Sequence, residues 1–291
     1  MNASHDLHTH STASDGTLTP EALVRRAAAA GVTVLALTDH DTTAGVADAV
    51  AVAQALGITL VPGAEISVTW GARTVHVVGL HLDISHPVLQ AGLAGLMTFR
   101  AWRAEEIGRR LAKQGIGQAY EGAKALSNGT LIGRTHFARF LVQQRLALDT
   151  AEVFKRFLVS GKPGHVAGQW ATLDAAVGWI RAAGGQAVLA HPARYGLTRT
   201  RMLTLLGEFR EHGGVGLEVV TGSHSRDDAF NFARHAREQR LLASAGSDYH
   251  GPEHPWLELG RLPPLPEGCT PIWHDWLEPA VRSHALLAAS G

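Results

Sequence analysis

The sequence predicts an α/β fold, in which strands alternate with helices around a largely parallel sheet that is either open or closed into a barrel. Two observations predict it. Short apolar runs alternate with helical patterns over residues 1–95 and again after residue 162, as is typical of βαβ units. Between these stretches, residues 97–165 carry amphipathic spacing and clustered arginines with little strand signal, which indicates a small helical insertion.

The first stretch contains clear start and stop signals. Thr19 is suited to cap a helix that begins with Pro20, and Gly31 stands just past its end. Gly57 similarly ends a second helical pattern. We therefore expect a helix up to Gly31, a buried strand at 33–38, a helix at 43–56, and strands at 58–61 and 74–82.

The alternation resumes after the insertion. We expect helices at 172–183, 200–211 and 227–239, strands at 187–190, 215–220 and 242–246, and a proline-rich tail from 262 that ends in a short helix. The predicted domains are thus a barrel or sheet domain formed by 1–96 and 166–291, and an inserted helical domain at 97–165.

Composition excludes several classes of protein. The 291 residues include 26 Lys and Arg against 26 Asp and Glu, a net charge of zero, which argues against a protein built mainly to hold a nucleic-acid backbone. The single cysteine, Cys269, excludes a disulfide framework and a thiolate zinc cluster. We see no signal peptide and no apolar run long enough for a membrane span, so we expect a cytoplasmic protein with no obligate protein partner.

The chain has 17 histidines, and several of them, with acidic residues, stand at the ends of the expected strands. That edge is the functional edge of parallel α/β folds. His8 and His10 are two residues apart, so in an extended segment both face the same side. The full set of metal-ligand candidates is His8, His10, Asp15, His40, Glu65, His76, His191, Asp248 and His250.

Each candidate has a simpler interpretation. A single histidine at a strand end is more often a hydrogen-bonded structural residue than a ligand, and the Asp residues beside His40 could cap the next helix. The recurrence of such residues at many strand ends is much harder to explain structurally, because buried imidazoles and carboxylates are costly unless paired. A polynuclear metal site explains the whole set.

The motifs Asp6-Leu7-His8-Thr9-His10-Ser11, Ser14-Asp15-Gly16, Thr38-Asp39-His40-Asp41, Glu65, His191-Pro192 and Gly246-Ser247-Asp248-Tyr249-His250 resemble those of the polymerase and histidinol phosphatase (PHP) family, in order and spacing. The insertion motif Ile132-Gly133-Arg134-Thr135-His136-Phe137-Ala138-Arg139 resembles the subgroup that acts on nucleoside 3′,5′-bisphosphates, related to 5′→3′ exoribonucleases of the RNase AM type. One departure is Thr135, where proline is expected in many relatives.

The resemblance implies a distorted (β/α)7 barrel with three divalent ions. His8, His10, Glu65 and Asp248 would hold the first, a bridging Glu65 with His76 and His191 the second, and Asp15, His40 and His250 the third. Nitrogen and oxygen ligands without sulfur suit Mn, Fe or Zn better than Cu(I), and of these we expect Mn, with Fe or Zn as alternatives. The residual positive charge of such a centre suits a phosphate group and a hydroxide.

Other residues are candidates for the chemistry around the ions. Arg194, a few residues after His191, could clamp the phosphoryl group, and His224 could protonate the leaving oxygen. Asp41, like Asp39, could orient His40 or a water molecule. For substrate binding we expect Arg134 and His136 at the 5′-phosphate, together with Ser223 and Arg194. An exposed Arg134 that forms only a surface ion pair is the simpler interpretation of that residue.

The expected activity is removal of the 3′-phosphate from a nucleoside 3′,5′-bisphosphate, which leaves the nucleoside 5′-monophosphate. The alternative is 5′→3′ exoribonuclease activity on short 5′-phosphorylated RNA, for which the insertion offers the basic residues Arg100, Arg103, Arg109, Arg110 and Lys113, interrupted by Glu105 and Glu106. Histidinol-phosphate phosphatase activity and a non-catalytic PHP module are less favoured. The expected partners are a small nucleotide and short RNA.

Overall fold

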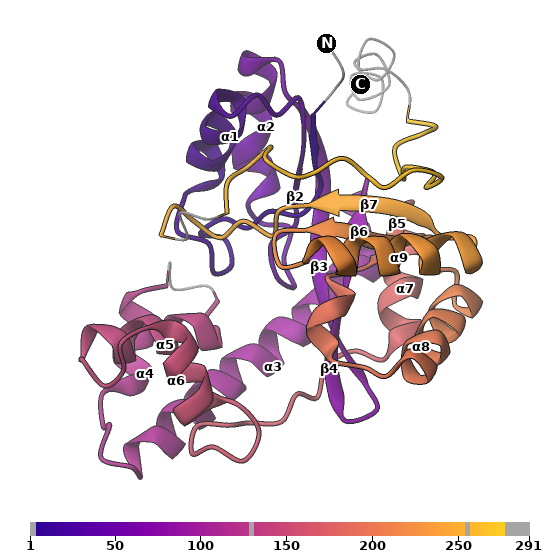
Figure 1. Cartoon of the computed structure of the whole chain (residues 1–291). Coiled ribbons are helices and arrows are strands. Elements are labelled where there is room, and N and C mark those ends of the chain that lie inside the picture. The colour runs from indigo at the N-terminus through magenta and orange to yellow at the C-terminus, as the bar shows by residue number, and fades with distance from the viewer. Residues whose placement is uncertain (1–3, 128–130, 254–256, 277–291) are drawn as a thin grey trace.

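The computed structural model describes residues 4–127, 131–253 and 257–276. The strands form a seven-stranded sheet in the order of the sequence, and Figure 1 labels β2 to β7. Its strands are β1 (His5–Asp6), β2 (Val34–Leu37), β3 (Thr59–Trp70), β4 (Arg73–Leu80), β5 (Gln186–Leu189), β6 (Gly216–Thr221) and β7 (Leu242–Gly246). The short helix expected late in the tail lies outside the described residues.

The two ends of the sheet meet through the segments that continue β1 and β7. The amide of Leu7 donates to the carbonyl of Ala245 at 3.0 Å, and the amide of Asp248 donates to the carbonyl of His8 at 2.8 Å. Thr9 and Tyr249 form a parallel bridge one step further along. The sheet is therefore a nearly closed barrel, which confirms the distorted seven-stranded architecture that the resemblance implied.

The expectation of a largely parallel sheet needs a correction at β4, which is antiparallel to both β3 and β5. β3 also continues to Trp70, well beyond the strand expected to end at Val61, and a tight turn at Gly71 (φ 58°) leads directly into β4. A left-handed residue suits glycine in such a hairpin. As a result Glu65 lies inside β3, beyond the expected end of the strand at residue 61.

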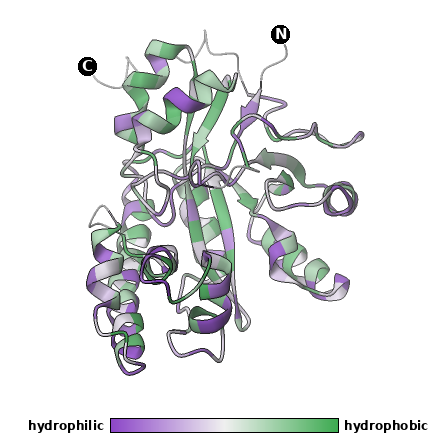
Figure 2. Ribbon diagram, turned by 60° about the vertical axis from the view of Figure 1, so that its left-hand side comes forward, coloured by the Kyte–Doolittle hydropathy of each residue, from purple (hydrophilic) through white to green (hydrophobic). Residues whose placement is uncertain are grey.

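Helices cover the outside of the barrel (Figure 1). They are α1 (Pro20–Ala29), α2 (Val46–Leu56), α7 (Leu173–Ala182), α8 (Arg199–Glu211) and α9 (Arg226–Glu238), with a 3₁₀ turn at Pro192–Tyr195. The expected signals are present: the Thr19 hydroxyl accepts from the amide of Ala22 at 3.2 Å, and Gly57 takes a left-handed conformation at the end of α2. Figure 2 shows hydrophobic residues concentrated along the strands.

The insertion has a small core of its own. Its helices are α3 (Pro87–Ala112), α4 (Ala119–Ala125), α5 (Arg134–Gln143) and α6 (Thr150–Val153), followed by a π-helical turn at Phe154–Leu158. Side chains such as Ile107, Leu111, Phe137 and Leu141 form an apolar cluster separate from the barrel core. α3 crosses residue 97 without a break, because its first half packs on α7 and its second half carries the insertion. None of the described helices is long and apolar enough to cross a membrane.

Candidate metal centre

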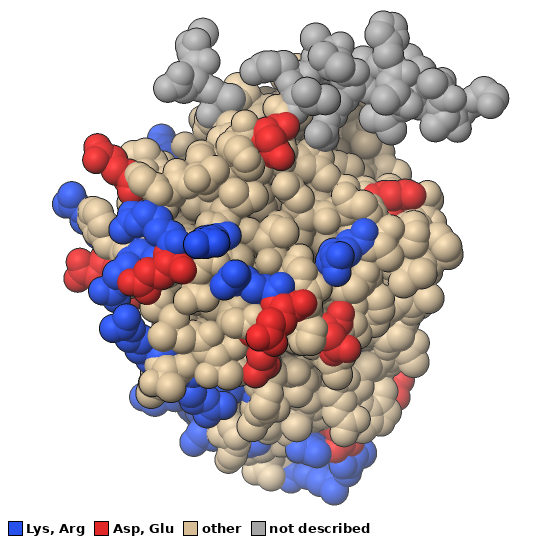
Figure 3. All heavy atoms as spheres, turned by 90° about the vertical axis from the view of Figure 1, so that its right-hand side faces the viewer, with Lys and Arg blue, Asp and Glu red and all other residues tan. Residues whose placement is uncertain are grey.

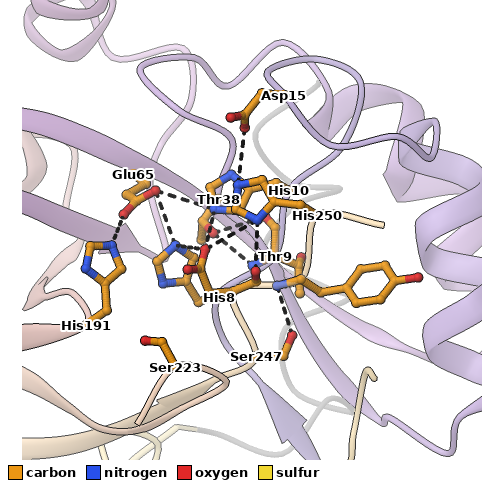
Figure 4. Close-up of polar contacts among 12 residues, drawn as sticks. His8, Thr9, His10, Asp15, Thr38, Glu65, His191, Ser223, Ser247 and His250 are labelled. Carbon is orange, nitrogen blue, oxygen red and sulfur yellow. Dashed lines mark hydrogen bonds and ion pairs between the residues drawn. The ribbon is translucent and has the colours of Figure 1, made fainter. Parts of the chain in front are cut away.

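The strands and the segments after them bring the nine expected ligand residues to one place, and Figure 4 labels His8, His10, Asp15, Glu65, His191 and His250 among them. They come from almost every strand: His8, His10 and Asp15 follow β1, His40 follows β2, Glu65 lies in β3, His76 lies in β4, His191 follows β5, and Asp248 and His250 follow β7. Parallel strands deliver their carboxyl ends to the same edge of a sheet, which explains most of this clustering. The antiparallel β4 contributes His76 from its interior, since His76 pairs in register with Ser67, two residues from Glu65.

Glu65 is the centre of the cluster and is fully buried. Its Oε1 atom lies 2.7 Å from His76 Nδ1 and 2.8 Å from His191 Nε2. Its Oε2 atom faces three further imidazoles: His40 Nδ1 at 2.8 Å, His8 Nε2 at 3.3 Å and His10 Nε2 at 3.4 Å. A carboxylate shared in this way is suited to bridge two cations.

The side chains fall into three overlapping groups, in each of which the potential ligand atoms lie within 4.8 Å of one another: His8, His10, Glu65 and Asp248; His10, Asp15, His40 and His250; and His40, Glu65 and His76. The first group is the implied first set. The second contains the implied third set plus His10, and the third has His40 where His191 was implied. His191 still contacts Glu65 directly.

Several polar atoms in the cluster are buried without a hydrogen-bond partner. They are His8 Nε2, His10 Nδ1, Asp15 Oδ1, His40 Nδ1, Glu65 Oε2, His191 Nδ1 and Asp248 Oδ2. Buried polar atoms are normally satisfied, and each exception needs an explanation. Imidazole nitrogens and carboxylate oxygens converging in this way are the donor set of Mn, Fe or Zn, so the residues present fit divalent cations.

The electrostatics of the cluster keep its carboxylates charged and two of its imidazoles neutral, whereas neighbouring carboxylates outweigh burial and raise the pKa values of His8, His40 and His250. Burial, and then the neighbouring His250, lowers the pKa of His10 to about 3, and burial lowers the pKa of His76 to about 4. Burial acts against the ionised form of Asp15, but His250 and His40 outweigh it and hold its pKa well below the usual value. Neutral imidazoles and charged carboxylates are the forms that bind metal ions.

Glu218, on β6, positions two of these residues and was missed by the sequence reasoning. Its Oε1 atom accepts from His8 Nδ1 at 2.7 Å, and its Oε2 atom accepts from the backbone amide of His191 at 2.5 Å. It thus orients the His8 ring through Nδ1, the nitrogen that does not face Glu65, as a carboxylate commonly does for a metal-binding histidine. The signal was a lone carboxylate inside the apolar run Gly216-Leu217-Glu218-Val219-Val220, since a charge is costly in a buried strand.

The expectation that Asp41 orients His40 needs a correction, because the carboxylate of Asp41 contacts neither His40 nor the ligand cluster. One oxygen accepts from the amide of Ser67 and the other from Arg100 Nε, both at 2.6 Å. Asp41 therefore fixes α3, which carries Arg100, against the barrel. Its neighbour Asp39 accepts from the hydroxyls of Ser11 and Ser14 at 2.7 and 2.6 Å, and so shapes the loop that carries Asp15.

The insertion reaches the cluster through the first turn of α5. Thr135 Oγ1 donates to Asp15 Oδ2 at 2.8 Å, a contact that proline at this position would lack. The adjacent Arg134 is partly buried, with its guanidinium 5.5 Å from the Phe154 ring centroid, and among the described residues it has no carboxylate partner. His136, expected to touch the substrate, is buried and its Nδ1 accepts from the amide of Gly133 at 3.0 Å, so this nitrogen helps to start α5.

On the opposite side, Arg194 forms an ion pair with Asp248, with the nearest nitrogen and Oδ2 2.7 Å apart, and about half of the arginine side chain stays exposed (48%). His224, expected to be a proton donor, has both ring nitrogens engaged: Nδ1 lies 2.9 Å from the carbonyl of Val219, and Nε2 accepts from the amide of Ala193 at 3.4 Å. In this arrangement His224 holds the turn that carries His191 and Arg194. Ser223 is exposed beside this turn and its hydroxyl pairs with Thr221 at 2.9 Å.

Three non-glycine residues at the cluster have left-handed backbones: His191 (φ 24°), Asp41 (φ 53°) and Asp248 (φ 58°). Such conformations each cost about 1–3 kcal/mol and persist where the surroundings enforce them. Here the enforcing contacts are the hydrogen bonds of Glu218 and Asp41 and the β1–β7 junction. The chain is held in the geometry that the cluster needs.

A family model described as the PHP domain matches residues 6–162. The chain belongs to the PHP family. Two relatives match it over nearly their whole lengths. A 3′,5′-nucleoside bisphosphate phosphatase of Chromobacterium violaceum is 47% identical over 94% of this chain and 96% of its own. The 5′-3′ exoribonuclease Rnm of Escherichia coli is 46% identical over 94% of each chain.

Solved structures of PHP relatives share the fold. An amidohydrolase from Chromobacterium violaceum, solved with bound sulfate and without metal, has a TM-score of 0.91 at 47% identity and covers 94% of this chain and 95% of its own. A candidate metal-dependent phosphoesterase from Bifidobacterium adolescentis has a TM-score of 0.78 at 26% identity, with 94% of each chain covered. The PHP barrel and its insertion are therefore common to this chain and to relatives of similar length.

Proposed function

We propose that this chain is a metal-dependent phosphatase that removes the 3′-phosphate of nucleoside 3′,5′-bisphosphates and releases the nucleoside 5′-monophosphate. The observation that carries the proposal is the position of Arg134, a cationic side chain next to the ligand cluster. Arg134 has no carboxylate partner in the described part of the chain, yet it adjoins Thr135, whose hydroxyl binds the cluster residue Asp15. A substrate with two phosphates would place one at each position.

The electrostatics around Arg134 support a phosphate subsite there. Burial, and then repulsion from Arg134 and Arg100, lowers the pKa of Arg103 to about 9, and burial together with Arg100 lowers the pKa of Arg134 as well. Within the part of the chain that the structure describes, Arg100 is the one of these guanidinium groups with a carboxylate partner, Asp41. Cations crowded in this way favour a bound anion, and a bidentate guanidinium is the strongest phosphate donor in proteins.

We propose nine metal ligands: His8, His10, Asp15, His40, Glu65, His76, His191, Asp248 and His250. Divalent ions, with Mn as the expected metal, would polarise the phosphoryl group and activate water. The overall reaction consumes one water, breaks the bond between phosphorus and the 3′-oxygen, and yields a 3′-hydroxyl and inorganic phosphate. Arg194, whose guanidinium is half exposed beside Asp248, would bind the phosphoryl oxygens that face away from the ligands.

The insertion would cap the substrate. We propose that residues 97–165 form a capping domain, which contributes Arg134 to the site and keeps the 5′-phosphate at a fixed distance from the cluster. Two contacts dock α5 on the barrel: Thr135 binds Asp15, and Arg139 pairs with Glu253 at 3.0 Å. Closing a site in this way excludes bulk water and strengthens the electrostatic interactions inside it.

The test measures phosphate release by Mn-loaded protein from adenosine 3′,5′-bisphosphate, AMP and histidinol phosphate in parallel. We expect a large preference for the bisphosphate, loss of activity in His191→Ala, and a KM for the bisphosphate raised about 10- to 100-fold in Arg134→Ala, since a hydrogen bond to a charged group contributes about 1.5–3 kcal/mol. Arg134→Lys should recover part of that loss because it keeps the charge.

The controls separate the competing functions. Arg134→Ala should leave the residual rate with AMP unchanged, because AMP has no second phosphate for this arginine. Preference for histidinol phosphate would replace the proposed substrate and leave the metal centre standing. A protein that binds metal but releases phosphate from none of the three substrates would instead favour a non-catalytic role.

A further inference from the structure

A cavity lies beyond the ligand cluster, between the 3₁₀ turn, α8 and α9. Its volume is about 320 Å³. Both apolar and charged side chains line it, chiefly Pro192, Ala193, Arg199, Asn231, Phe232 and Arg234. We call this cavity, with the exposed face of α9 beside it, the α8–α9 groove. The proposed hydrolysis of a bisphosphate does not use it.

The groove begins where the ligand cluster ends. Pro192 and Ala193, in its wall, directly follow His191 in the chain. Behind them, the His224 ring stacks on Phe232, with ring centroids 5.1 Å apart and planes at 22°. Arg194, on the same turn, contacts Asp248. The turn that carries Arg194 therefore lies between the cluster and the groove and borders both.

The groove carries cations that the protein itself does not neutralise. Arg199 and Arg226 are exposed and have no carboxylate partner in the described residues, while Arg234 lies 4.0 Å from Glu238. Asp228 also lines the cavity, but its carboxylate accepts from the amide and the hydroxyl of Ser225 as part of a helix cap. Figure 3 views this side of the molecule, where basic side chains gather with acidic ones between them.

An exposed aromatic ring accompanies these cations. Phe230 is 55% exposed, and the Arg226 guanidinium lies 5.8 Å from its ring centroid. Arg226, Phe230 and Arg234 are spaced four residues apart on α9, so they share one face of the helix. Cations that follow a phosphate backbone, interleaved with an aromatic ring on which a base can stack, are the usual components of a surface for single-stranded nucleic acid.

Apart from the exposed Lys113, the basic residues of the insertion that had offered another path for RNA bind other groups of the protein. Arg109 and Arg110 both pair with Glu106 on α3. Arg103 donates to the carbonyl of Val166 at 3.2 Å. Charge complementarity with a polynucleotide therefore favours the α8–α9 groove over α3.

We propose that the α8–α9 groove binds the nucleotides on the 3′ side of the scissile phosphate in a short single-stranded oligonucleotide. This inference rests on the proposed function and extends it from monoesters to diesters. Water attacks the same phosphorus and the same bond to the 3′-oxygen breaks. A nucleoside 5′-monophosphate leaves, and the shortened oligonucleotide keeps the phosphate at its new 5′ end, ready for another cycle.

The experiment compares substrates that end before the groove with substrates that enter it. In the Arg199→Gln/Arg234→Gln double variant, we expect the KM for a five-nucleotide 5′-phosphorylated RNA to rise about tenfold, a loss of roughly 1.4 kcal/mol, while kcat/KM for adenosine 3′,5′-bisphosphate stays within about twofold of the wild-type value. Phe230→Ala should weaken RNA in the same selective way. Arg25→Gln/Arg145→Gln, which removes two exposed charges elsewhere, is the matched control and should change neither substrate.

A binding measurement separates this inference from the proposed function. Fluorescence anisotropy of a 3′-labelled five-nucleotide RNA on metal-free protein should show weaker binding in the double variant than in the charge-matched control, and DNA of the same sequence shows whether the groove discriminates the sugar. Equal effects of the double variant and the control on RNA binding would overturn the groove proposal. If wild type fails to hydrolyse the bisphosphate but the groove variants still lose RNA binding, the proposed function is wrong and the groove stands.

Discussion

At the scale of single residues, the cluster depends on side chains that do not themselves belong to it. Glu218 is buried in the middle of β6 and has no role in the barrel core, yet it binds the ring of His8 and the backbone of His191. An imidazole whose one nitrogen is held by a hydrogen bond presents its other nitrogen in a constant direction, which favours one coordination geometry. Glu218 therefore belongs to the construction of the site as much as the proposed ligands do.

Glu218→Gln should lower the affinity for divalent metal by about 10- to 100-fold, because an amide cannot stabilise the imidazole as a carboxylate does. Isothermal titration with Mn²⁺ measures this directly. Glu238→Gln, on the surface of α9, is the control and should bind metal like the wild type. Unchanged metal affinity in Glu218→Gln would mean that His8 needs no carboxylate to hold its orientation.

At the scale of secondary-structure elements, α3 links the barrel to the insertion, and its contact with α7 is close. A Cβ atom added at Gly92 would lie 2.4 Å from the Trp179 ring, whereas one added at Gly95, three residues later, would meet nothing within 4 Å. The glycine at 92 is thus required by a packing contact between helices, and the glycine at 95 is not.

The two positions predict opposite effects within one helix. Gly95→Ala should raise the free energy of unfolding by about 0.5–1 kcal/mol, since alanine is the better helix former. Gly92→Ala gains the same propensity but must displace Trp179, and overpacking costs about 1–3 kcal/mol, so its free energy of unfolding should fall. Urea denaturation of both variants checks this, and a stabilised Gly92→Ala would show that Trp179 moves aside freely.

The elements also show how far sequence reasoning extends. Helices with clear caps, such as the one begun by Thr19 and Pro20 and the one ended by Gly57, were predicted within a few residues, because the signals are local. The course of β3 through Pro62 and Gly63 was not, since proline and glycine normally mark an end to a strand. Here the residues are held by parallel pairing with β2 on one side and antiparallel pairing with β4 on the other.

The site was predictable in part for the same reason. Ligand candidates stood out because histidines and carboxylates at strand ends have few structural uses, and the motifs matched a family. Roles that depend on contacts across the fold could not be predicted: Asp41 binds Arg100 from a helix 59 positions away, and His224 turns both nitrogens to the backbone. A sequence shows which side chains could react, but it does not show which groups those side chains hydrogen-bond in the folded protein.

At the scale of the whole molecule, the ligand cluster joins most of the strands at one end of the barrel. Metal binding to the folded state alone stabilises it by mass action. We expect Mn²⁺ to raise the melting temperature in a concentration-dependent manner, equivalent to about 2.7 kcal/mol at one hundred times Kd, and a chelator to reverse the effect. Thermal scans of wild type and His191→Ala measure it. An equal rise in both proteins would indicate that the metal binds elsewhere.

The junction between β1 and β7 has a consequence for the synthesis of the protein. His8 and His10 are synthesised long before Asp248 and His250, the residues with which they share two of the groups described above. A growing chain on the ribosome therefore cannot complete the cluster until the segment that carries Asp248 and His250 has been made. With the metal ligands proposed above, the growing chain cannot hydrolyse phosphoesters before that point, while its own messenger RNA is close by.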